Sequence, residues 1–460
     1  MAEFLEFLSR QSFADLVRLL WFYFIFDFPR YILLDVYGIV IYIFERRFRR
    51  SAYHEARQRL WKEMPFVSII VPGKDEAENY YSLVRTLKEQ TYQNFELIII
   101  DDGSEDHSEL LGRQMERNGD IDLFLSTDTR GGKASAANLG FNYSKGKYVL
   151  HFDADSSFYR DAVERILIPF YMDGKIGAVA GNLEVRNKEE SLATILQTIE
   201  YFFTITVARL VNAKLGILRI VSGAFGAFRR DLLEQVGGWD VGPGLDGDLT
   251  TKIRKLGYKI HFEPLATALT SVPTSFFSLA KQRVRWSRSL IRFRLRKHRD
   301  ILMVSKASHF KNIISVLENL FFNLGVNIVF WIYLVDILIN FNTYIVYILL
   351  LSFLLYSGSK FIEYLLYLAI GDDRRSKLKY LFFVPGMVLY TGYFIRTVRT
   401  IAYVVEIIWK ESFADPWNPK KTSDASRQLE DYIASDTKIY DQYIKQRKGK
   451  KQEQPAESSE

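Results

Sequence analysis

Residues 66–104 read FVSIIVPGKDEAENYYSLVRTLKEQTYQNFELIIIDDGS, and this stretch decides the fold. Phe66-Val-Ser-Ile-Ile-Val71 is a short β-branched run ended by Pro72-Gly73, and Phe95-Glu-Leu-Ile-Ile-Ile100 is a second apolar run. Between them, Tyr81 to Gln90 has a helical pattern. A strand–helix–strand unit of this kind predicts two parallel strands joined by a right-handed crossover. Ligands bind such sheets beyond the carboxyl ends of the strands, so the site of this α/β domain is expected there.

Acidic residues follow three of the predicted strands. Lys74-Asp75-Glu76 comes after the first, Asp101-Asp102 after the second, and Asp153-Ala154-Asp155 after a third, Lys147-Tyr-Val-Leu-His-Phe152. Carboxylates gathered at one edge repel one another unless a partner binds there. Mg²⁺ and Mn²⁺ suit Asp153 and Asp155, because these hard ions are often held by one or two carboxylates while substrate phosphates complete the shell. A solvated turn is the alternative for an isolated Asp-x-Asp.

Further segments carry candidate residues. Gly131-Gly132-Lys133 opens a helix of small residues that can present N–H groups to phosphate, or it is a plain helix start. Ile220 to Arg230 is rich in small residues, for close approach to a flat ligand or for tight packing. Asp246 and Asp248 lead into a helix, where either is a helix cap or a general base. Lys281 begins a basic amphipathic segment that runs to about Arg299 and is typical of a helix on a membrane surface.

The composition places this domain beside a membrane. The chain has 460 residues, a length that favours two or three domains, and it contains no cysteine, which excludes disulfides, zinc–thiolate sites and a cysteine nucleophile. Its formal charge is +7, but the basic residues cluster beside apolar runs. The positive-inside rule explains this clustering better than nucleic acid does, so no nucleic-acid partner is expected.

Apolar segments flank the predicted domain on both sides. One tilted helix over about 22–44 is expected to span the membrane, and the basic run 45–50 after it places the following domain in the cytoplasm. Three more apolar segments follow at about 313–341, 343–370 and 379–409, the last being one helix with an amphipathic piece or a broken hairpin. We therefore predict five parts: an N-terminal interfacial and transmembrane helix with a basic flank (1–50), a cytoplasmic domain (51–275), amphipathic interface helices (276–310), C-terminal transmembrane helices (311–410) and a partly disordered cytoplasmic tail (411–460).

Taken in order, four motifs resemble the series found in membrane-embedded family 2 glycosyltransferases, the processive synthases of cellulose, hyaluronan, chitin oligomers and poly-N-acetylglucosamine. The motifs are Asp101-Asp102, Asp153-Ala154-Asp155, Asp246, and Gln282-x-x-Arg285-Trp286. The resemblance covers about residues 65–300, and the stretch from Ser222 to Arg230 is most similar to the poly-N-acetylglucosamine synthases. It implies a GT-A (Rossmann-like) glycosyltransferase domain in the cytoplasm, combined with α-helical transmembrane segments, and an inverting mechanism.

The resemblance also implies roles in binding the donor. Asp75, Glu76 and Asp101 or Asp102 would hold the uridine part of a nucleotide-sugar, and Lys133 would approach its phosphates. Asp155, with help from Asp153, would bind the Mg²⁺ or Mn²⁺ that bridges the diphosphate. Three more residues are counted among those that bind substrate: Pro72, Ser222 and Gly223.

On the acceptor side, the resemblance makes Asp246 the base that deprotonates the attacking hydroxyl. Trp286 would stack against the acceptor sugar, while Gln282 and Arg285 would line the donor pocket near the diphosphate. Leu245 departs from the family, which usually has Glu before the catalytic Asp, and Asp248 is the residue that would compensate. Lys74-Asp75 departs from the usual Tyr-Asn.

The predicted function is therefore that of an inverting enzyme of the plasma (inner) membrane. It would transfer a sugar, expected to be UDP-linked, to a growing polysaccharide through β-linkages and move the polymer across the membrane. Lys410 to Lys421, with Trp417, is either a gating loop over the donor site or a plain tail. The alternatives are a lipid glycosyltransferase similar to ceramide glucosyltransferases and an inactive scaffold subunit of an export complex. Expected partners are the nucleotide-sugar donor, a polysaccharide or lipid acceptor, membrane lipids and export subunits.

Overall fold

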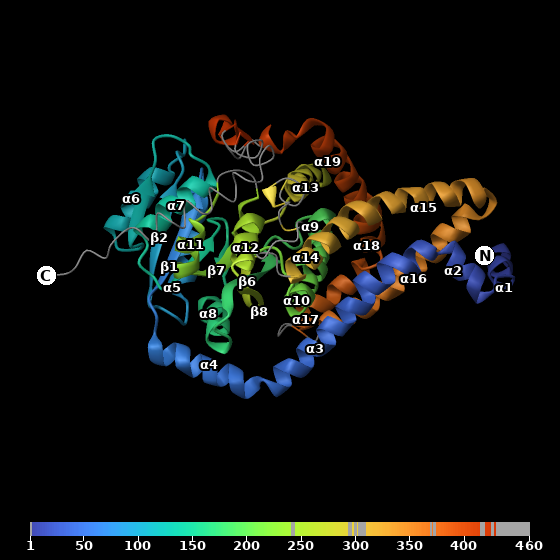
Figure 1. Ribbon diagram of the computed structural model, residues 1–460, viewed down its shortest axis with the longest axis horizontal. Coiled ribbons are helices and arrows are strands. Elements are labelled where there is room, and N and C mark those ends of the chain that lie inside the picture. Colours follow the sequence, from blue (N-terminus) through green and yellow to red (C-terminus); the bar gives the residue numbers. More distant parts are fainter. Residues whose placement is uncertain are drawn as a thin grey trace.

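The computed structural model describes residues 2–240, 244–292, 297–298, 301, 310–368, 370, 374–414, 419–424 and 427–428. Trp417 lies outside these residues, and so does most of the predicted tail. The structure has a domain built on one sheet and an arm of long helices that projects from it, with the N-terminus at the far end of the arm (Figure 1).

Eight strands form one mixed sheet in the order β3-β2-β1-β4-β7-β6-β8-β5. They are β1 (Val67–Gly73), β2 (Phe95–Asp101), β3 (Leu123–Ser126), β4 (Tyr148–Phe152), β5 (Ser157–Phe158), β6 (Ile176–Val185), β7 (Phe225–Arg229) and β8 (Lys259–Thr270). β1 pairs in parallel with β2 and β4, which confirms the predicted parallel unit with helix α5 (Ala77–Lys88) between its strands. β7 runs antiparallel to β4, with Phe225 opposite Phe152. The residues before β7 therefore lie at the carboxyl end of β4.

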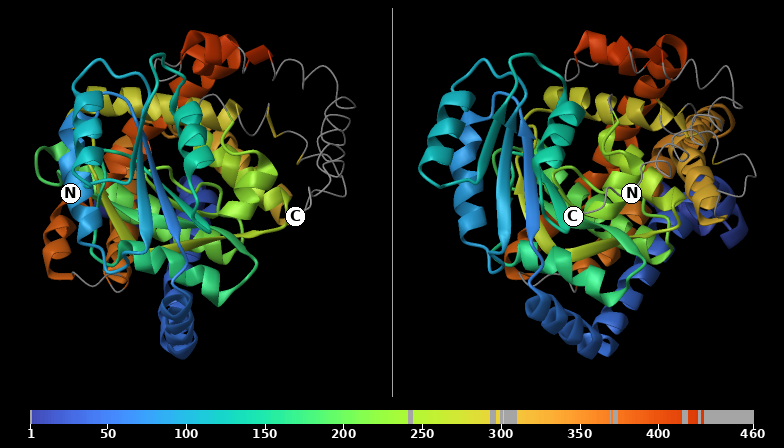
Figure 2. Two further views of the ribbon diagram at one scale, coloured as in Figure 1. Left: turned by 90° about the vertical axis from the view of Figure 1, so that its left-hand side faces the viewer. Right: turned by 60° about the vertical axis from the view of Figure 1, so that its left-hand side comes forward.

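Both faces of the sheet are buried, because side chains of a strand point alternately to its two sides. In β1, Ile69 and Val71 face one hydrophobic cluster and Ile70 faces the other. Figure 2 shows helices on both sides of the strands. The first cluster includes residues of α4 (Arg50–Glu63), α5, α6 (Ser108–Arg117) and α8 (Ala162–Met172). The second includes residues of α7 (Lys133–Tyr143), α9 (Leu192–Tyr201), η2 (Phe202–Val207), α10 (Ala208–Lys214), α11 (Arg230–Val236) and α12 (Leu245–Lys255).

The remaining helices come from the two ends of the chain. The N-terminal ones are α1 (Ala2–Ser9), α2 (Phe13–Leu19), the π-helical η1 (Tyr23–Leu33) and α3 (Leu34–Phe48). The C-terminal ones are α13 (Phe276–Ile291), α14 (Phe310–Leu320), η5 (Phe321–Gly325), α15 (Val326–Asn340), η6 (Asn342–Tyr344), α16 (Ile345–Tyr367), α17 (Arg374–Leu378), η7 (Lys379–Phe383), α18 (Gly386–Leu389), η8 (Tyr390–Ile395), α19 (Arg396–Trp409) and η9 (Glu411–Ala414).

Among the described residues, two continuous helices are long and apolar enough to cross a membrane, Phe310–Asn340 and Asn342–Tyr367. A third candidate, Arg375–Phe383 with Gly386–Trp409, is bent by 61°. These segments correspond to the three predicted after residue 310, and the bend agrees with the expectation that the last segment is interrupted. The predicted span over 22–44 is helical but is not among the candidates, and it holds Asp27, Arg30 and Asp35.

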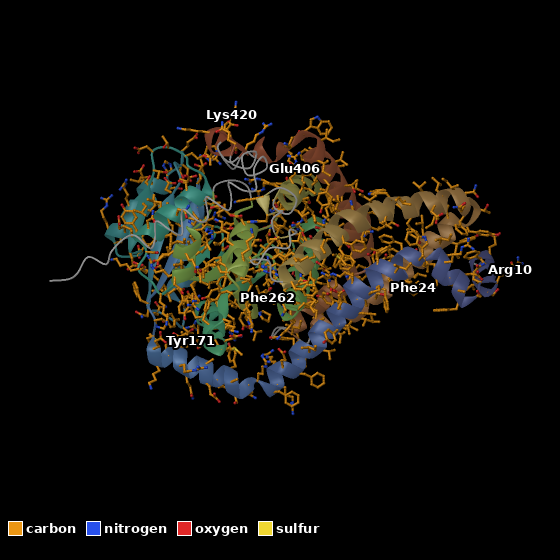
Figure 3. All side chains as sticks on the ribbon, viewed as in Figure 1. Arg10, Phe24, Tyr171, Phe262, Glu406 and Lys420 are labelled. Carbon is orange, nitrogen blue, oxygen red and sulfur yellow. The ribbon has the colours of Figure 1, made fainter. Side chains whose placement is uncertain are left out.

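Two charged residues within the predicted N-terminal span, Asp27 and Arg30, contact other helices. Arg30 Nε donates to Glu318 Oε1 at 2.6 Å, and Tyr356 donates its hydroxyl hydrogen to Asp27. Phe22 packs in the same region, with its ring centroid 5.4 Å from that of Phe330. Figure 3 shows Phe24 on this arm. Polar groups in apolar helices are typically turned inward and paired in this way.

Candidate active site

The carboxyl ends of β1, β2 and β4 lie side by side, as the sequence predicted. Gly73 is in register with Asp101, and Pro72 with Ile100, so Pro72 is a buried strand residue directly below this edge. Asp101 is 1% exposed, and its carboxylate accepts hydrogen bonds from the hydroxyls of Ser104 and Ser126. The Asp101 carboxylate therefore holds the loop after β2.

Asp102 joins this loop to the start of α7. Its two carboxylate oxygens accept hydrogen bonds from Gly131 N–H at 2.7 Å and from Gly132 N–H at 2.8 Å. Burial raises the pKa of Asp102, and the two N–H groups oppose that effect. Gly132 has a φ of 90°, a conformation in which glycine costs little. Asp102 thus positions the glycine pair that places Lys133 at the first turn of α7.

Asp75 and Glu76 occupy the loop after β1. Asp75 adopts a φ of 58° and accepts a hydrogen bond from Glu105 N–H at 2.8 Å, while its own N–H donates to Ser104 Oγ at 2.7 Å. Glu76 is partly buried and accepts from Asn79 Nδ2 at 2.6 Å. Burial, with Asp155 and Asp153 nearby, raises the pKa of Glu76 to about 7. The structure therefore brings Glu76 toward the Asp-x-Asp motif and leaves Asp75 exposed.

Lys133 forms an ion pair with Asp153. Although burial opposes ionisation of Asp153, the positive charges of Lys133 and Arg285 hold its pKa below the ordinary value. Burial also opposes the charge of Lys133, and Asp153 and Asp246 outweigh it, so the pKa of Lys133 is raised. Lys133 therefore stands in the electrostatic field of both acidic motifs.

Asp155 is placed differently from Asp153. Its Oδ1 is buried and receives no hydrogen bond from any residue that the structure describes. Burial and the charge of Asp153 raise the pKa of this carboxyl. A buried carboxylate oxygen without a donor fits a site for a cation, because leaving such an atom unpaired is costly. No described group of three or more His, Asp or Glu side chains is arranged to hold a metal ion, so two carboxylates would need ligands from elsewhere.

Asp246 lies in the first turn of α12, whose N-cap is Gly244, so neither Asp246 nor Asp248 is the helix cap. The N–H of Gly223 donates to Asp246 Oδ2 at 2.8 Å. A Cβ on Gly223 would lie 2.9 Å from Asp246 Oδ1, so this position has little room for a side chain. The neighbouring Ser222 is half-buried just before β7.

Asp248 is buried and forms ion pairs with residues that follow α13. Its carboxylate is 2% exposed and lies 2.7 Å from His298 Nε2 and 2.9 Å from Lys297 Nζ. Burial opposes its ionisation, but Lys297, His298 and Lys252 hold the pKa of Asp248 well below its usual range. Leu245 itself packs against the hydrophobic cluster under α12. Asp246 is thus the acidic residue of this turn that faces the Asp-x-Asp motif.

Helix α13 carries Gln282, Arg285 and Trp286 and packs along α19. The yellow helix in Figure 2 is α13, and it lies crosswise to the strands. Arg283 anchors it through Glu200 at 2.8 Å and lies 4.3 Å from the centroid of the Trp286 ring. Trp286 is 43% exposed, whereas Gln282 Oε1 is buried with no hydrogen bond from the described residues.

Two residues near these motifs were not singled out from the sequence. His151 is buried in β4, where the signal was one polar residue inside an apolar strand. Arg209 in α10 was hidden in the apolar run 202–211. Burial lowers the pKa of Arg209 to about 10 against the opposing charge of Asp246, and its Nη1 has no hydrogen-bond partner among the described residues.

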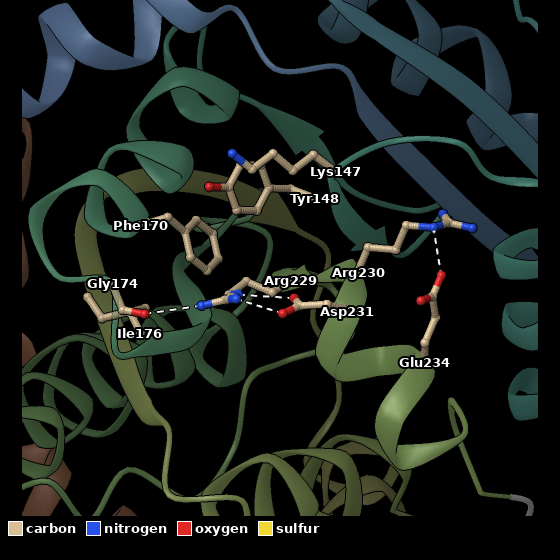
Figure 4. Close-up of a pocket in the computed structure, with 9 residues that line it drawn as sticks. All are labelled: Lys147, Tyr148, Phe170, Gly174, Ile176, Arg229, Arg230, Asp231 and Glu234. Carbon is tan, nitrogen blue, oxygen red and sulfur yellow. Dashed lines mark hydrogen bonds and ion pairs between the residues drawn. The ribbon is translucent and has the colours of Figure 1, made fainter. Parts of the chain in front are cut away.

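A cavity of about 500 Å³ lies at the other end of β4 (Figure 4). Lys147, Arg229 and Arg230 line it, but Arg229 is paired with Asp231 and Arg230 with Glu234. The cavity residue Lys147 lies near Tyr171. Figure 3 shows Tyr171 close to α4, on the opposite side of the molecule from Glu406 and Lys420. Thr422 follows Lys420 by two residues, and its Oγ1 is 3.5 Å from Gly131 O. Because Gly131 contacts Asp102, the acidic strand ends lie on the same side of the molecule as Lys420. The cavity is therefore separate from the candidate site.

The sequence of this chain is similar to proteins of a known family. The family model described as "Glycosyl transferase family 2" matches residues 68–237. The poly-beta-1,6-N-acetyl-D-glucosamine synthase of Staphylococcus aureus (strain COL) is 30% identical over 318 residues, which are 68% of this chain and 74% of the relative. The synthase of the same name from Staphylococcus epidermidis is 32% identical over 272 residues, 58% of this chain and 64% of the relative.

Among solved structures, a mannosyltransferase from Pyrobaculum calidifontis in complex with GDP-Man and Mn²⁺ has a TM-score of 0.52 and 20% sequence identity. The match covers 82% of this chain and 100% of that one. Together with the family match, it confirms the predicted GT-A fold.

Proposed function

The chain belongs to glycosyltransferase family 2, and from this premise we propose that it is an inverting membrane synthase that extends a polysaccharide. It takes the sugar from a UDP-linked donor, forms β-linkages and passes the product through its own membrane helices. The catalytic domain faces the cytoplasm and the helices lie in the plasma (inner) membrane. N-acetylglucosamine is the sugar we propose, because the two staphylococcal relatives are named as synthases of a polymer of it.

One observation carries the proposal: Lys133 pairs with Asp153 and also lies in the field of Asp246 and Asp155. A cation between the Asp-x-Asp motif and a second carboxylate suits a donor diphosphate, whose negative charge grows as the bond to the sugar breaks. Arg285 adds positive charge near Asp153 from α13. The phosphates would thus lie between α7 and α13.

The donor's uridine would lie over the loops after β1 and β2. Asp75 and Glu76 offer carboxylates there, and the exposed one, Asp75, is suited to the ribose and base. Asp101 and Asp102 act through the backbone that they hold, since their oxygens already accept hydrogen bonds from this loop. Pro72, Ser222 and Gly223 form the rim of strand ends beneath the donor.

Mg²⁺ or Mn²⁺ fits the unpaired oxygen of Asp155, with Asp153 beside it. When bound together with the donor, such an ion neutralises charge on the departing diphosphate. Because Asp153 is also paired with Lys133, the two carboxylates alone provide few ligands, and oxygens of the diphosphate would complete the shell. The structural neighbour, named as a complex with GDP-Man and Mn²⁺, supports a divalent ion in a fold of this kind.

Asp246 is the proposed general base. Gly223 N–H donates to its Oδ2, and we assign to its Oδ1 the role of accepting the proton of the acceptor hydroxyl. The hydroxyl oxygen then forms the bond to the anomeric carbon while the nucleoside diphosphate leaves with the electron pair. One base is sufficient for a single displacement, in contrast to retaining enzymes with a nucleophilic carboxylate. Trp286 offers an exposed apolar face for the acceptor sugar, and Gln282 and Arg285 belong to the same helix.

The test is to incubate the purified protein with Mg²⁺ or Mn²⁺ and a panel of UDP-GlcNAc, UDP-Glc, UDP-GlcA and GDP-Man, following nucleoside diphosphate release and product length. We expect a polymer from UDP-GlcNAc, lost in Asp246→Asn and kept in Asp231→Asn, a matched change in the distant cavity. One sugar on a lipid would favour a lipid glycosyltransferase, and a wild-type protein without transfer would favour a scaffold subunit. In sealed vesicles with the catalytic domain outside, polymer found only outside would contradict translocation.

A further inference from the structure

His151 makes one polar contact with the described part of the chain, and that contact is to the backbone beside Asp246. The residue is 1% exposed within β4, and its Nδ1 lies 2.6 Å from the carbonyl oxygen of Gly223. A carbonyl can only accept, so Nδ1 carries the proton and donates it. No described residue is in hydrogen-bond contact with Nε2. The ring is therefore fixed in one tautomer by Gly223.

Gly223 is hydrogen-bonded to both His151 and Asp246. Its carbonyl receives the hydrogen bond of His151, and its own N–H donates to Asp246 Oδ2 at 2.8 Å. Glycine restricts its backbone less than any other residue, so hydrogen bonds on both sides determine how its two peptide groups are turned. A Cβ here would lie 2.9 Å from Asp246 Oδ1 and 3.1 Å from His151 Cε1, so the glycine is enclosed by the two side chains.

The imidazole is itself held from the side of α7. The Trp239 ring lies 5.4 Å from that of His151, tilted by 38°. Asn138 on α7 fixes Trp239 by two backbone hydrogen bonds, from Asn138 Nδ2 to Trp239 O at 2.7 Å and from Trp239 N–H to Asn138 Oδ1 at 2.9 Å. A continuous set of contacts thus connects the helix that begins at Lys133 with the carboxylate of Asp246.

We propose that His151 is a positioning residue for Asp246, acting through the Gly223 peptide groups. Its Nδ1–H holds the Gly223 carbonyl, which keeps the Gly223 N–H directed at Oδ2 and leaves Oδ1 to take the acceptor proton. The inference rests on the proposed role of Asp246 as the base. It adds a residue that acts on the base through the backbone of Gly223 and determines how the base is oriented.

Three substitutions at one position test the proposal, because Asn and Gln place an amide where Nδ1 and Nε2 of histidine lie, respectively. His151→Asn keeps a donor near Nδ1, and we expect most of kcat to remain. His151→Gln and His151→Leu lose that donor. We expect kcat to fall by about tenfold to a hundredfold, the scale of a misplaced catalytic group, with KM for the donor and Kd for UDP unchanged. Kd for UDP and the thermal midpoint are measured for every variant to establish that it is folded.

Equal kcat in the Asn, Gln and Leu variants, at any level, would overturn the inference, and so would a loss that appears in KM or Kd for UDP. If His151→Leu does not fold, the comparison of Asn with Gln decides the matter, since both are polar and similar in size. The proposed function is judged separately by Asp246→Asn. Transfer that survives Asp246→Asn removes the base, whereas a dead Asp246→Asn beside a fully active His151→Gln removes only the positioning role.

Discussion

At the scale of single residues, the proposed metal site at Asp155 has few ligands of its own, and this limits how it can bind an ion. Two carboxylates, one of them paired with Lys133, cannot surround a divalent ion, and the described residues offer no third acidic or histidine ligand in a cluster. An ion that binds tightly here must therefore arrive with phosphate oxygens. This dependence would keep the metal site coupled to the presence of donor.

The corresponding prediction is that Mn²⁺ binds at least tenfold more tightly in the presence of UDP than alone, since the diphosphate supplies ligands. Asp155→Ala should abolish this enhancement and the transfer reaction while leaving the thermal midpoint near that of the wild type. Titration calorimetry with Mn²⁺, with and without UDP, measures it. Asp120→Ala, a surface change, is the control, and equal Mn²⁺ affinity without UDP would contradict the prediction.

Glu263 is a buried carboxyl that the proposed reaction does not use. Leu265 N–H donates to it at 3.2 Å, and burial raises its pKa from 4.5 to about 7. His261 lies 4.0 Å away but offers no charge at neutral pH, because burial lowers its pKa to about 4. Between about pH 4.5 and pH 7 the folded chain therefore holds a proton on Glu263 that the unfolded chain has released.

The stability contributed by this proton is present at low pH and is lost as pH rises through 7. Glu263→Gln needs no proton. We therefore predict that its free energy of unfolding, relative to that of the wild type, rises by up to about 3 kcal/mol between pH 5 and pH 8. Thermal unfolding of both proteins across this range gives the difference. The exposed Glu109→Gln is the control, and a difference between Glu263→Gln and the wild type that stays constant with pH would refute the assigned pKa of Glu263.

At the scale of elements, α12 carries two carboxylates with different tasks in its first turn. Asp246 is directed at Gly223, whereas Asp248 is buried against Lys297 and His298. Removing one partner of a buried ion pair leaves an uncompensated charge, which typically costs about 3–5 kcal/mol. Asp248 therefore ties α12 to the segment that follows α13.

The different contacts of Asp246 and Asp248 predict opposite phenotypes when each is replaced by asparagine. Asp246→Asn should lose transfer by a factor of about 10² or more, the usual contribution of a general base, and keep its thermal midpoint. Asp248→Asn should unfold at a lower temperature by an amount equivalent to about 1.5–3 kcal/mol, the loss of a hydrogen bond to a charged group, because the buried Lys297 keeps Asp240 as an acidic partner at 2.9 Å. Melting curves and donor turnover on the same preparations separate the two, and a stable but inactive Asp248→Asn would reverse the assignment.

The elements around the site were largely predictable because their signals are local. Strands β1, β2 and β4 are short apolar runs closed by acidic residues, and a parallel arrangement brings those closing residues to one edge. The antiparallel strand β7 was not predicted, because its partner β4 is far away in sequence. Without β7, nothing in the sequence places Gly223 beside Asp246.

Some contacts of the predicted site residues could not be read from the sequence for the same reason. Asp101 or Asp102 is predicted to hold uridine, and the hydrogen bonds of Asp102 with Gly131 and Gly132 depend on the loop closing over β2. Asp248 looked like a spare base, and Lys297 and His298, which bury it, come from beyond α13. Periodicity and motif spacing record which residues are near in sequence, and these contacts join residues about 30 to 50 positions apart.

At the scale of the whole molecule, Glu318 on α14 joins the catalytic domain to the helical arm. It pairs with Arg30 of η1, at 2.6 Å, and with Arg219, which lies just before the small-residue segment leading to β7. Arg254 of α12 reinforces this junction, since it donates to Asn312 Oδ1 at 2.9 Å and to the Ser315 hydroxyl at 3.1 Å on the same helix. Helix α12, which carries Asp246, and a candidate membrane helix are therefore fixed to each other by buried polar contacts.

Glu318→Gln should leave Arg30 and Arg219 as two cations facing a neutral amide, and we predict a loss of about 3 kcal/mol in stability. The double variant Arg30→Gln/Glu318→Gln should be less destabilised than the sum of the two single changes, because it no longer buries that unpaired cation. Thermal unfolding in one detergent gives the four members of this cycle. Glu411→Gln, at an exposed pair with Arg288, is the matched control and should change little. Strictly additive effects would mean that Arg30 and Glu318 are not coupled, so that this pair does not help to hold the arm to the catalytic domain.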